Sequence, residues 1–292
     1  MILLDAPARA RLLDRFGPEV GRWCDELPAL VDTLTRRWRL QVLSAIPGGT
    51  GRTLMCRDSA GRSAVLKLTP EPDIAATEAA ALRAWAGCSR VVHLIGTDLE
   101  AGALLLEGVV PGTPLADSTG DLPLDEIADL LAQLRTVASP EGLPTLAERV
   151  AGFFDLAERR WRGSAAERHL PLEVLRRSRA AAAELGAGGP TTLVHGDLHA
   201  RNVLEGAAGI VAIDPRPCVG DPTFDAVDWA FLPVSTGGRI DHGIDALGER
   251  LPGLDTDRLR RWCASLAVLL ALGPLRRDMP TPYTATLVQM AP

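Results

Sequence analysis

Hydrophobic positions follow two different periods along the 292-residue chain. In residues 1–40 apolar side chains recur at helical spacing, as at Leu27 and Leu34, and Pro28 predicts a break in that helix. From residue 38 apolar and polar positions alternate in short runs, which is typical of strands. The predicted strands are residues 40–43, 52–57, 63–68, 91–96 and 103–107.

Helical periodicity dominates the second half of the chain. Amphipathic stripes cover residues 124–134, 146–161 and 172–185, and helices resume at 225 and at 257–272, whereas 215–226 is predicted to be irregular. Among the strands, one alanine-rich helix opens at Thr77. Glycine and proline in residues 107–112 (EGVVPG) predict a hinge.

These periods predict an α+β protein with three segments. Residues 1–37 form an N-terminal helical segment, residues 38–108 a small lobe, and residues 109–292 a larger, mainly helical lobe. The small lobe combines an antiparallel sheet with one helix.

Polar chemistry concentrates in one loop between two apolar segments that are each able to form a strand. The loop carries Asp197 and Asn202, and Asp214 follows the next predicted strand. Two carboxylates and an amide oxygen suit Mg²⁺, which is usually bound by a few protein oxygens together with phosphate oxygens of the substrate. Spare acid–base capacity beside such a metal indicates phosphoryl transfer to a hydroxyl group. The alternative is a pair of turn aspartates that cap local backbone.

The predicted small lobe contains two further features of a phosphate site. Its first turn holds Gly48, Gly49 and Gly51, which would let backbone amides approach phosphates, although a glycine-rich hairpin is often only a hairpin. Lys67 lies in an otherwise apolar strand, and Glu78 follows in the helix. The two could form an ion pair that holds nucleotide phosphates. Alternatively, they are an edge lysine and a glutamate favoured by the helix dipole.

Composition narrows the class of partner. The formal net charge is -6 and the sequence pI is about 5.5, which argues against nucleic acid as a partner and is compatible with a cationic substrate.

Five scattered cysteines form no C-x-x-C pair, so we expect reduced thiols that pack in the interior. No signal peptide is visible, and the longest apolar run, 262–273, is too short for a bilayer. We therefore expect a cytoplasmic protein without membrane partners; a monomer is favoured.

The polar loop carries a family resemblance. Residues 195–202 (HGDLHARN), followed by 213–215 (IDP), closely resemble the signature of the aminoglycoside phosphotransferase family, which has a protein-kinase-like two-lobe fold. The resemblance spans roughly residues 38–272. Within the family, residues 214–225 (DPRPCVGDPTFD) look most like the streptomycin 6-phosphotransferase and hydroxyurea phosphotransferase branch.

The resemblance implies an ATP- and Mg²⁺-dependent kinase that phosphorylates a hydroxyl group of a small cationic antibiotic, a streptomycin-type aminoglycoside, and it assigns roles to residues. Asp197 would be the base for the acceptor hydroxyl, and Asn202 and Asp214 would bind Mg²⁺. Lys67 would hold the α- and β-phosphates, with Glu78 orienting it. The nucleotide would also contact the glycines of the first turn (Gly48, Gly49, Gly51) and, through its adenine edge, the backbone of Glu107 to Val109.

The remaining polar residues of this region receive supporting roles or an acceptor role. By the same resemblance His195 packs beneath the loop, and Asp225 braces the backbone of the loop. His199 either supports the loop or lies near the phosphates. Asp221 is the acidic residue we expect at the acceptor, because carboxylates suit the guanidinium groups of a streptomycin-type acceptor.

Two alternatives remain open for the function. The acceptor could instead be hydroxyurea, a sugar, an amino alcohol or another antibiotic, because acceptor sites vary on one catalytic scaffold. The chain could also be a non-catalytic nucleotide-binding module, which the retention of Lys67, Asp197, Asn202 and Asp214 disfavours. A protein kinase is disfavoured by the absence of D-F-G and A-P-E segments.

Overall fold

The computed structural model describes residues 3–46, 51–235 and 237–292. The chain divides into two compact units, one formed by residues 1–118 with 204–213 and the other by 119–203 with 214–292. The first unit thus extends ten residues past the predicted boundary at 108 and recruits a later hairpin.

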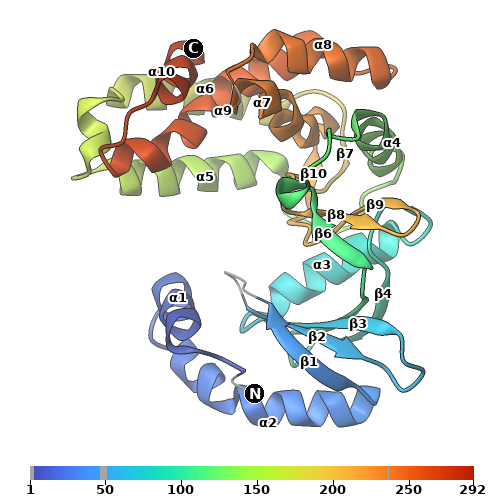
Figure 1. Ribbon diagram of the computed structural model, residues 1–292. Helices are drawn as coiled ribbons and strands as arrows, with labels where there is room; N and C mark the ends of the chain where they lie inside the picture. Colours follow the sequence, from blue (N-terminus) through green and yellow to red (C-terminus); the bar gives the residue numbers. More distant parts are fainter. Residues whose placement is uncertain (1–2, 47–50, 236) are drawn as a thin grey trace. The chain divides into compact units, whose positions relative to one another are not determined.

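The first unit is built around a five-stranded antiparallel sheet (Figure 1). Its strands are ordered β1-β2-β3-β5-β4. They span β1 (Gln41–Ile46), β2 (Arg52–Arg57), β3 (Ser63–Leu68), β4 (Leu94–Asp98) and β5 (Ala103–Glu107). The alternation read from the sequence therefore gave five strands and their approximate positions, except that β4 begins three residues later than predicted.

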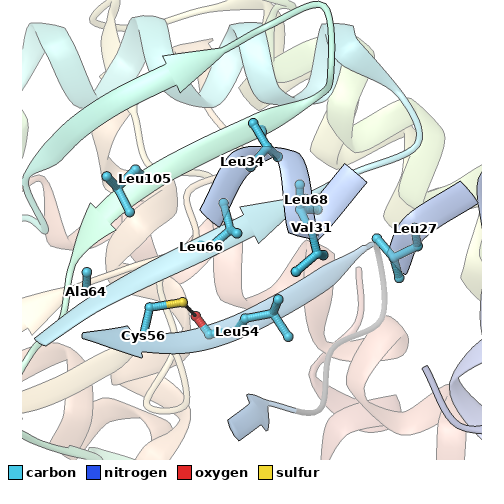
Figure 2. Packing of buried hydrophobic residues seen from close by; sticks show 10 residues of the cluster. Leu27, Val31, Leu34, Leu54, Cys56, Ala64, Leu66, Leu68 and Leu105 are labelled. Carbon is cyan, nitrogen blue, oxygen red and sulfur yellow. Dashed lines mark hydrogen bonds between the residues drawn. The ribbon is translucent and has the colours of Figure 1, made fainter. Parts of the chain in front are cut away.

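One face of this sheet packs against helix α2 (Val20–Trp38), which follows α1 (Ala6–Phe16). Leu27, Val31 and Leu34 of α2 are buried against apolar side chains of β2, β3 and β5, and Figure 2 shows them together. The predicted break at Pro28 is wrong, because α2 runs through it. An interior proline costs about 3 kcal/mol in a helix, a cost that burial of the neighbouring Leu27 and Val31 offsets.

Helix α3 (Pro72–Ala84) completes the small lobe, and it begins five residues before the predicted start. Proline at its first position suits a helix N-terminus. Glu78 consequently lies in the middle of the helix rather than in its first turn. A three-stranded sheet of β6 (Pro111–Pro114), β8 (Val203–Gly206) and β9 (Gly209–Ala212) also belongs largely to this unit.

The second unit is mainly helical and centres on the long helix α9 (Thr256–Arg276). Around it are α4 (Leu124–Leu134), α5 (Leu146–Trp161), α6 (Leu172–Ala187), α7 (Val227–Ser235), α8 (Ile240–Arg250) and α10 (Pro282–Met290). All of these except α4 contact α9 closely, and Trp262 and Cys263 of α9 are fully buried. Short 3-10 turns cover Leu115–Asp117, Ala165–Arg168 and Pro222–Ala226.

Residues 215–226, predicted to be irregular, contain a short strand, β10 (Cys218–Gly220). It pairs antiparallel with β7 (Thr192–Val194), the strand that leads into the polar loop. Three residues are too few to show a period, so no pattern in the sequence indicates this strand. All five cysteines are buried and unbridged, as predicted. Among the described residues no helix is long and apolar enough to cross a membrane.

Candidate functional site

The loop of residues 195–202, which follows β7, has its first peptide units fixed by a buried carboxylate. Asp225 accepts the N–H of His195 at 2.7 Å through Oδ2 and the N–H of Gly196 at 2.9 Å through Oδ1. Both bonds brace the backbone of the loop, which is the supporting role that the family resemblance implied for Asp225. Burial raises the pKa of Asp225 to about 7, while the two amide donors and Arg149 oppose that shift.

The carbonyl groups of the same residues are held from two other places. The N–H of Arg216 donates to the carbonyl of His195 at 2.9 Å, and Arg149 Nε donates to the carbonyl of Gly196 at 3.0 Å. Gly196 has φ of +75°, and an added Cβ would lie 2.3 Å from the carbonyl oxygen of Arg216. Only glycine fits this position.

Asp197 is the first residue of the loop with a partly exposed carboxylate. Its N–H donates to Nδ1 of the buried His195 at 3.4 Å, and its carbonyl accepts from Asn202 Nδ2 at 3.0 Å. His199 Nε2 lies 3.8 Å from Asp197 Oδ1, too far for a hydrogen bond but close enough for electrostatic attraction. The carboxylate is therefore presented at the surface while its own peptide group is fully bonded.

Asn202 and Asp214 supply the oxygen donors predicted to bind a metal. The amide nitrogen of Asn202 donates hydrogen bonds to the carbonyl oxygen and to Oδ2 of Asp197. The amide oxygen of Asn202, Oδ1, is therefore the atom that would coordinate a metal. Asp214 has φ of +55°, in the left-handed region, and Arg216 Nη2 lies 3.9 Å from its carboxylate. Strained backbone of this kind recurs at ligand-binding positions.

This donor set fits Mg²⁺ rather than a transition metal. Within the described ranges no group of three His, Cys, Asp or Glu side chains could hold an ion. Mg²⁺ needs no such cage, because it commonly uses one or two protein oxygens and completes its shell with water and phosphate. Asn202 Oδ1 and the Asp214 carboxylate are oxygen groups of the type that such a site would use.

Asp221, predicted to contact the acceptor, has a different environment. Its side chain is buried and accepts from Arg258 Nε at 2.5 Å and from Trp262 Nε1 at 2.6 Å. It also caps the following 3-10 turn through the N–H of Thr223. These bonds, which tie the turn to α9, leave no free carboxylate for a ligand. The geometry does not support the predicted acceptor role and favours a structural one.

Asp228, one helical turn beyond Asp225, is exposed. Although the residue as a whole is exposed, desolvation of its carboxyl group by the surrounding protein raises the pKa of that group, an effect that His199 opposes and the charge of Asp197 increases. Among the described residues its carboxylate makes no hydrogen bond or ion pair, and it also interacts electrostatically with Tyr283 of α10. An accessible carboxylate with no protein partner, near Asp197, is the acidic group of this unit best suited to a cationic ligand.

In the first unit, Lys67 and Glu78 form the predicted ion pair. Lys67 Nζ lies 2.7 Å and 2.6 Å from the two carboxylate oxygens of Glu78, whose side chain is 2% exposed. Buried ion pairs contribute little net stability because desolvation offsets the attraction. The main effect of this ion pair is therefore to fix the position of the Lys67 ammonium group, and its contribution to stability is small.

The other predicted nucleotide contacts are in the same unit. Gly51 lies so close to β3 that an added Cβ would be 2.0 Å from the carbonyl oxygen of Leu68. Gly48 and Gly49 fall outside the described residues. Glu107 ends β5 and exchanges hydrogen bonds with the backbone of His93. Among the described residues the backbone N–H and C=O of Val109 have no protein partner, which suits a contact with a planar base edge.

The sequence analysis assigned no role to Arg149 or to Asp228. Arg149 had a recognisable signal, because it interrupts the apolar stripe of α5 between Leu146 and Val150, both buried. A charge on the buried face of a helix needs a partner. For Asp228 the sequence offered only another acidic residue near a helix start.

Comparison with known proteins places this geometry in a family. The model of the family described as aminoglycoside/hydroxyurea antibiotic resistance kinase matches residues 37–275. A hydroxyurea phosphotransferase of Kitasatospora aureofaciens is 36% identical over 85% of this chain and 73% of its own. A streptomycin 6-kinase of Streptomyces glaucescens is 32% identical over 77% of this chain and 73% of its own.

A solved structure extends the similarity to the fold. The choline kinase LicA of Streptococcus pneumoniae superimposes with a TM-score of 0.62 and 15% identity, covering 91% of this chain and 96% of LicA. At this level of identity the likeness shows the kinase-like fold alone. It confirms the predicted fold class.

Proposed function

Because the chain belongs to the aminoglycoside/hydroxyurea antibiotic resistance kinase family and is a small-molecule kinase, we propose that its phosphoryl donor is Mg²⁺-ATP and its acceptor a hydroxyl group of a streptomycin-type aminoglycoside. The observation that carries the proposal is the 195–202 loop. Its backbone is fully bonded from His195 to Asp197, and the Asp197 carboxylate remains accessible.

In the proposed reaction Asp197 accepts the proton of the acceptor hydroxyl. The acceptor oxygen forms a bond to the γ-phosphorus as the bond from that phosphorus to the β,γ-bridging oxygen breaks, and ADP leaves. Asn202 and Asp214 would hold Mg²⁺, which when bound would neutralise phosphate charge. Lys67, fixed by Glu78, would hold the α- and β-phosphates, and the backbone of Val109 would contact the adenine edge.

The preference for a cationic acceptor rests on Asp228. Its exposed carboxylate, which has no hydrogen bond or ion pair within the described part of the chain, would pair with a guanidinium group, which forms two parallel hydrogen bonds to a carboxylate. Hydroxyurea is neutral and would gain much less from that carboxylate. It remains the second candidate, because a hydroxyurea phosphotransferase is 36% identical to this chain.

The test measures phosphoryl transfer by wild type, Asp197→Ala and Asp228→Asn with streptomycin, hydroxyurea and simple sugars as acceptors. We expect transfer to streptomycin by wild type and a loss of about 10²- to 10⁴-fold in kcat for Asp197→Ala, the usual contribution of a general base. Asp228→Asn should raise the KM for streptomycin and leave that for hydroxyurea unchanged.

Three outcomes separate the hypotheses. Equal turnover by wild type and Asp197→Ala would refute the role of Asp197. Turnover of hydroxyurea but not streptomycin would change the acceptor and retain the mechanism. Nucleotide binding without turnover of any acceptor would favour the non-catalytic module.

A further inference from the structure

Helix α5 sends a charged side chain to the backbone of the 195–202 loop. Arg149 Nε donates to the carbonyl oxygen of Gly196 at 3.0 Å, across 47 positions in sequence. The guanidinium group also lies over the ring of Phe153, one turn further along α5, at 5.0 Å from the ring centroid. Desolvation lowers the pKa of Arg149, and the negative charges of Asp197 and Asp225 are among the groups that oppose this shift. Burying the Arg149 guanidinium group costs desolvation free energy, so its presence at this position indicates a functional role.

The carbonyl that Arg149 holds belongs to the peptide unit joining Gly196 to Asp197. The direction of this carbonyl fixes the plane of that unit, and hence the direction in which the Asp197 side chain leaves the backbone. Gly196, at φ of +75°, is the residue of the loop with the widest conformational freedom. An external hydrogen bond at this point removes the freedom that glycine introduces.

The other hydrogen bonds of the loop involve groups other than the Gly196 carbonyl. Asp225 holds the N–H groups of His195 and Gly196, and the Arg216 N–H holds the His195 carbonyl. Asn202 and the His199 N–H hold the carbonyl of Asp197. None of these groups bonds to the Gly196 carbonyl, so among the described residues loss of Arg149 would leave that carbonyl without a protein partner.

We propose that Arg149 is a positioning residue for phosphoryl transfer, because it sets the orientation of the Gly196–Asp197 peptide unit and so of the Asp197 carboxylate. The proposal rests on the proposed role of Asp197 as the base. It assigns Arg149 no contact with nucleotide or acceptor. A rotated peptide unit would move the carboxylate away from the acceptor hydroxyl, and displacements of about 1 Å are costly in catalysis.

The experiment compares Arg149→Gln and Arg149→Lys with Arg160→Gln, a control on the same helix whose side chain is exposed. Each variant is tested for thermal unfolding, for kcat and KM of phosphoryl transfer, and for hydrogen exchange of the amides in residues 193–199. Arg149→Gln should lower kcat about 10- to 100-fold, the equivalent of one lost charge-assisted hydrogen bond. The KM for nucleotide should stay within about twofold, because Arg149 meets no phosphate in the proposed mechanism.

Two further readouts distinguish positioning from packing. Amide exchange at residues 193–199 should rise in Arg149→Gln and stay at the wild-type level in Arg160→Gln. Arg149→Lys should recover part of kcat, because an ammonium group can donate to the same carbonyl. If Arg149→Gln does not fold, Arg149→Lys carries the test through kcat and exchange, and an unchanged kcat in the lysine variant with raised exchange overturns the proposal.

Failure of this proposal differs from failure of the proposed function. A stable Arg149→Gln variant with wild-type kcat would overturn the positioning role while the kinase mechanism stood. Absence of acceptor turnover in wild type would refute the proposed function. The proposal for Arg149 would then fall with it, whatever the exchange experiment showed about the loop.

Discussion

At the scale of single residues, the 195–202 loop depends on Asp225. Its carboxyl group is buried, and its two oxygens serve different N–H donors, those of His195 and Gly196. The Asp225 pKa of about 7 lies far above the value of about 4 expected for an unfolded aspartate. Folding is therefore linked to the uptake of a proton at this residue in the pH range between the two values.

We predict that Asp225→Asn alters the pH dependence of stability. Since the folded-state pKa is raised, the contribution of Asp225 to stability is fully present below about pH 4 and is lost as pH rises through about 7. The asparagine cannot titrate, so its free energy of unfolding should fall less steeply between pH 5 and 7. Its single oxygen accepts only one of the two N–H groups, so the variant should also be less stable throughout.

Urea unfolding of both proteins at several pH values between 5 and 8 measures this difference. Asp257→Asn, which removes an exposed carboxylate of α9, serves as the control and should run parallel to wild type. Parallel curves for wild type and Asp225→Asn would contradict the prediction.

At the scale of elements, the start of α5 determines where Arg149 lies. Thr145 caps this helix through a capping box, in which its hydroxyl accepts the N–H of Glu148 at 3.1 Å. The Glu148 carboxylate accepts the N–H of Thr145 in return at 2.8 Å. Arg149 is the next residue, so the cap fixes the first turn from which its side chain extends.

We predict that Thr145→Ala lowers the free energy of unfolding by about 1 kcal/mol, the usual cost of losing such a cap. Because the first turn frays, kcat should fall modestly with it. Glu148→Gln is the matched control, since glutamine also completes a capping box. Urea unfolding and steady-state kinetics measure both effects, and equal stability of Thr145→Ala and wild type would exclude a contribution from the cap.

At the scale of the whole molecule, the chain forms two units, each with buried apolar side chains of its own. In the first unit α2 covers one face of the sheet (Figures 1 and 2). Lys67 lies on that sheet, in strand β3, whose neighbours Leu66 and Leu68 point into the core under α2. The position of the ammonium group therefore depends on α2 being docked.

We predict that Leu34→Ala lowers the free energy of unfolding of the first unit by about 2–5 kcal/mol, the range for a fully buried leucine. Amide exchange should become faster in β2, β3 and β5 before it changes in the 195–202 loop. Leu43→Ala is the control, because Leu43 is 47% exposed on β1 and should change stability by no more than about 0.5 kcal/mol. An equal effect of the two substitutions would refute the role of α2 in this core.

The sequence by itself determined the features that depend on neighbours along the chain. Alternation predicted the five strands, helical spacing predicted most helices, and the fixed spacing of Asp197, Asn202 and Asp214 predicted the reaction class. Lys67 and Glu78 could be paired only together with the downstream polar loop, whose resemblance to kinase-like proteins implies an ion pair between a strand lysine and a helix glutamate. These inferences succeed because period and spacing are local properties of the chain.

Only the tertiary structure decided which distant side chains meet. In the folded protein Arg149 donates a hydrogen bond to the Gly196 carbonyl, and Asp221 is buried against Arg258 and Trp262. The tertiary structure also left Asp228 exposed near Asp197. One acidic residue resembles another in sequence, since burial and partners depend on how the helices pack. The sequence of residues 214–228 therefore shows which acidic groups are present. The packing of α7 and α9 determines which of these groups remains available to a ligand.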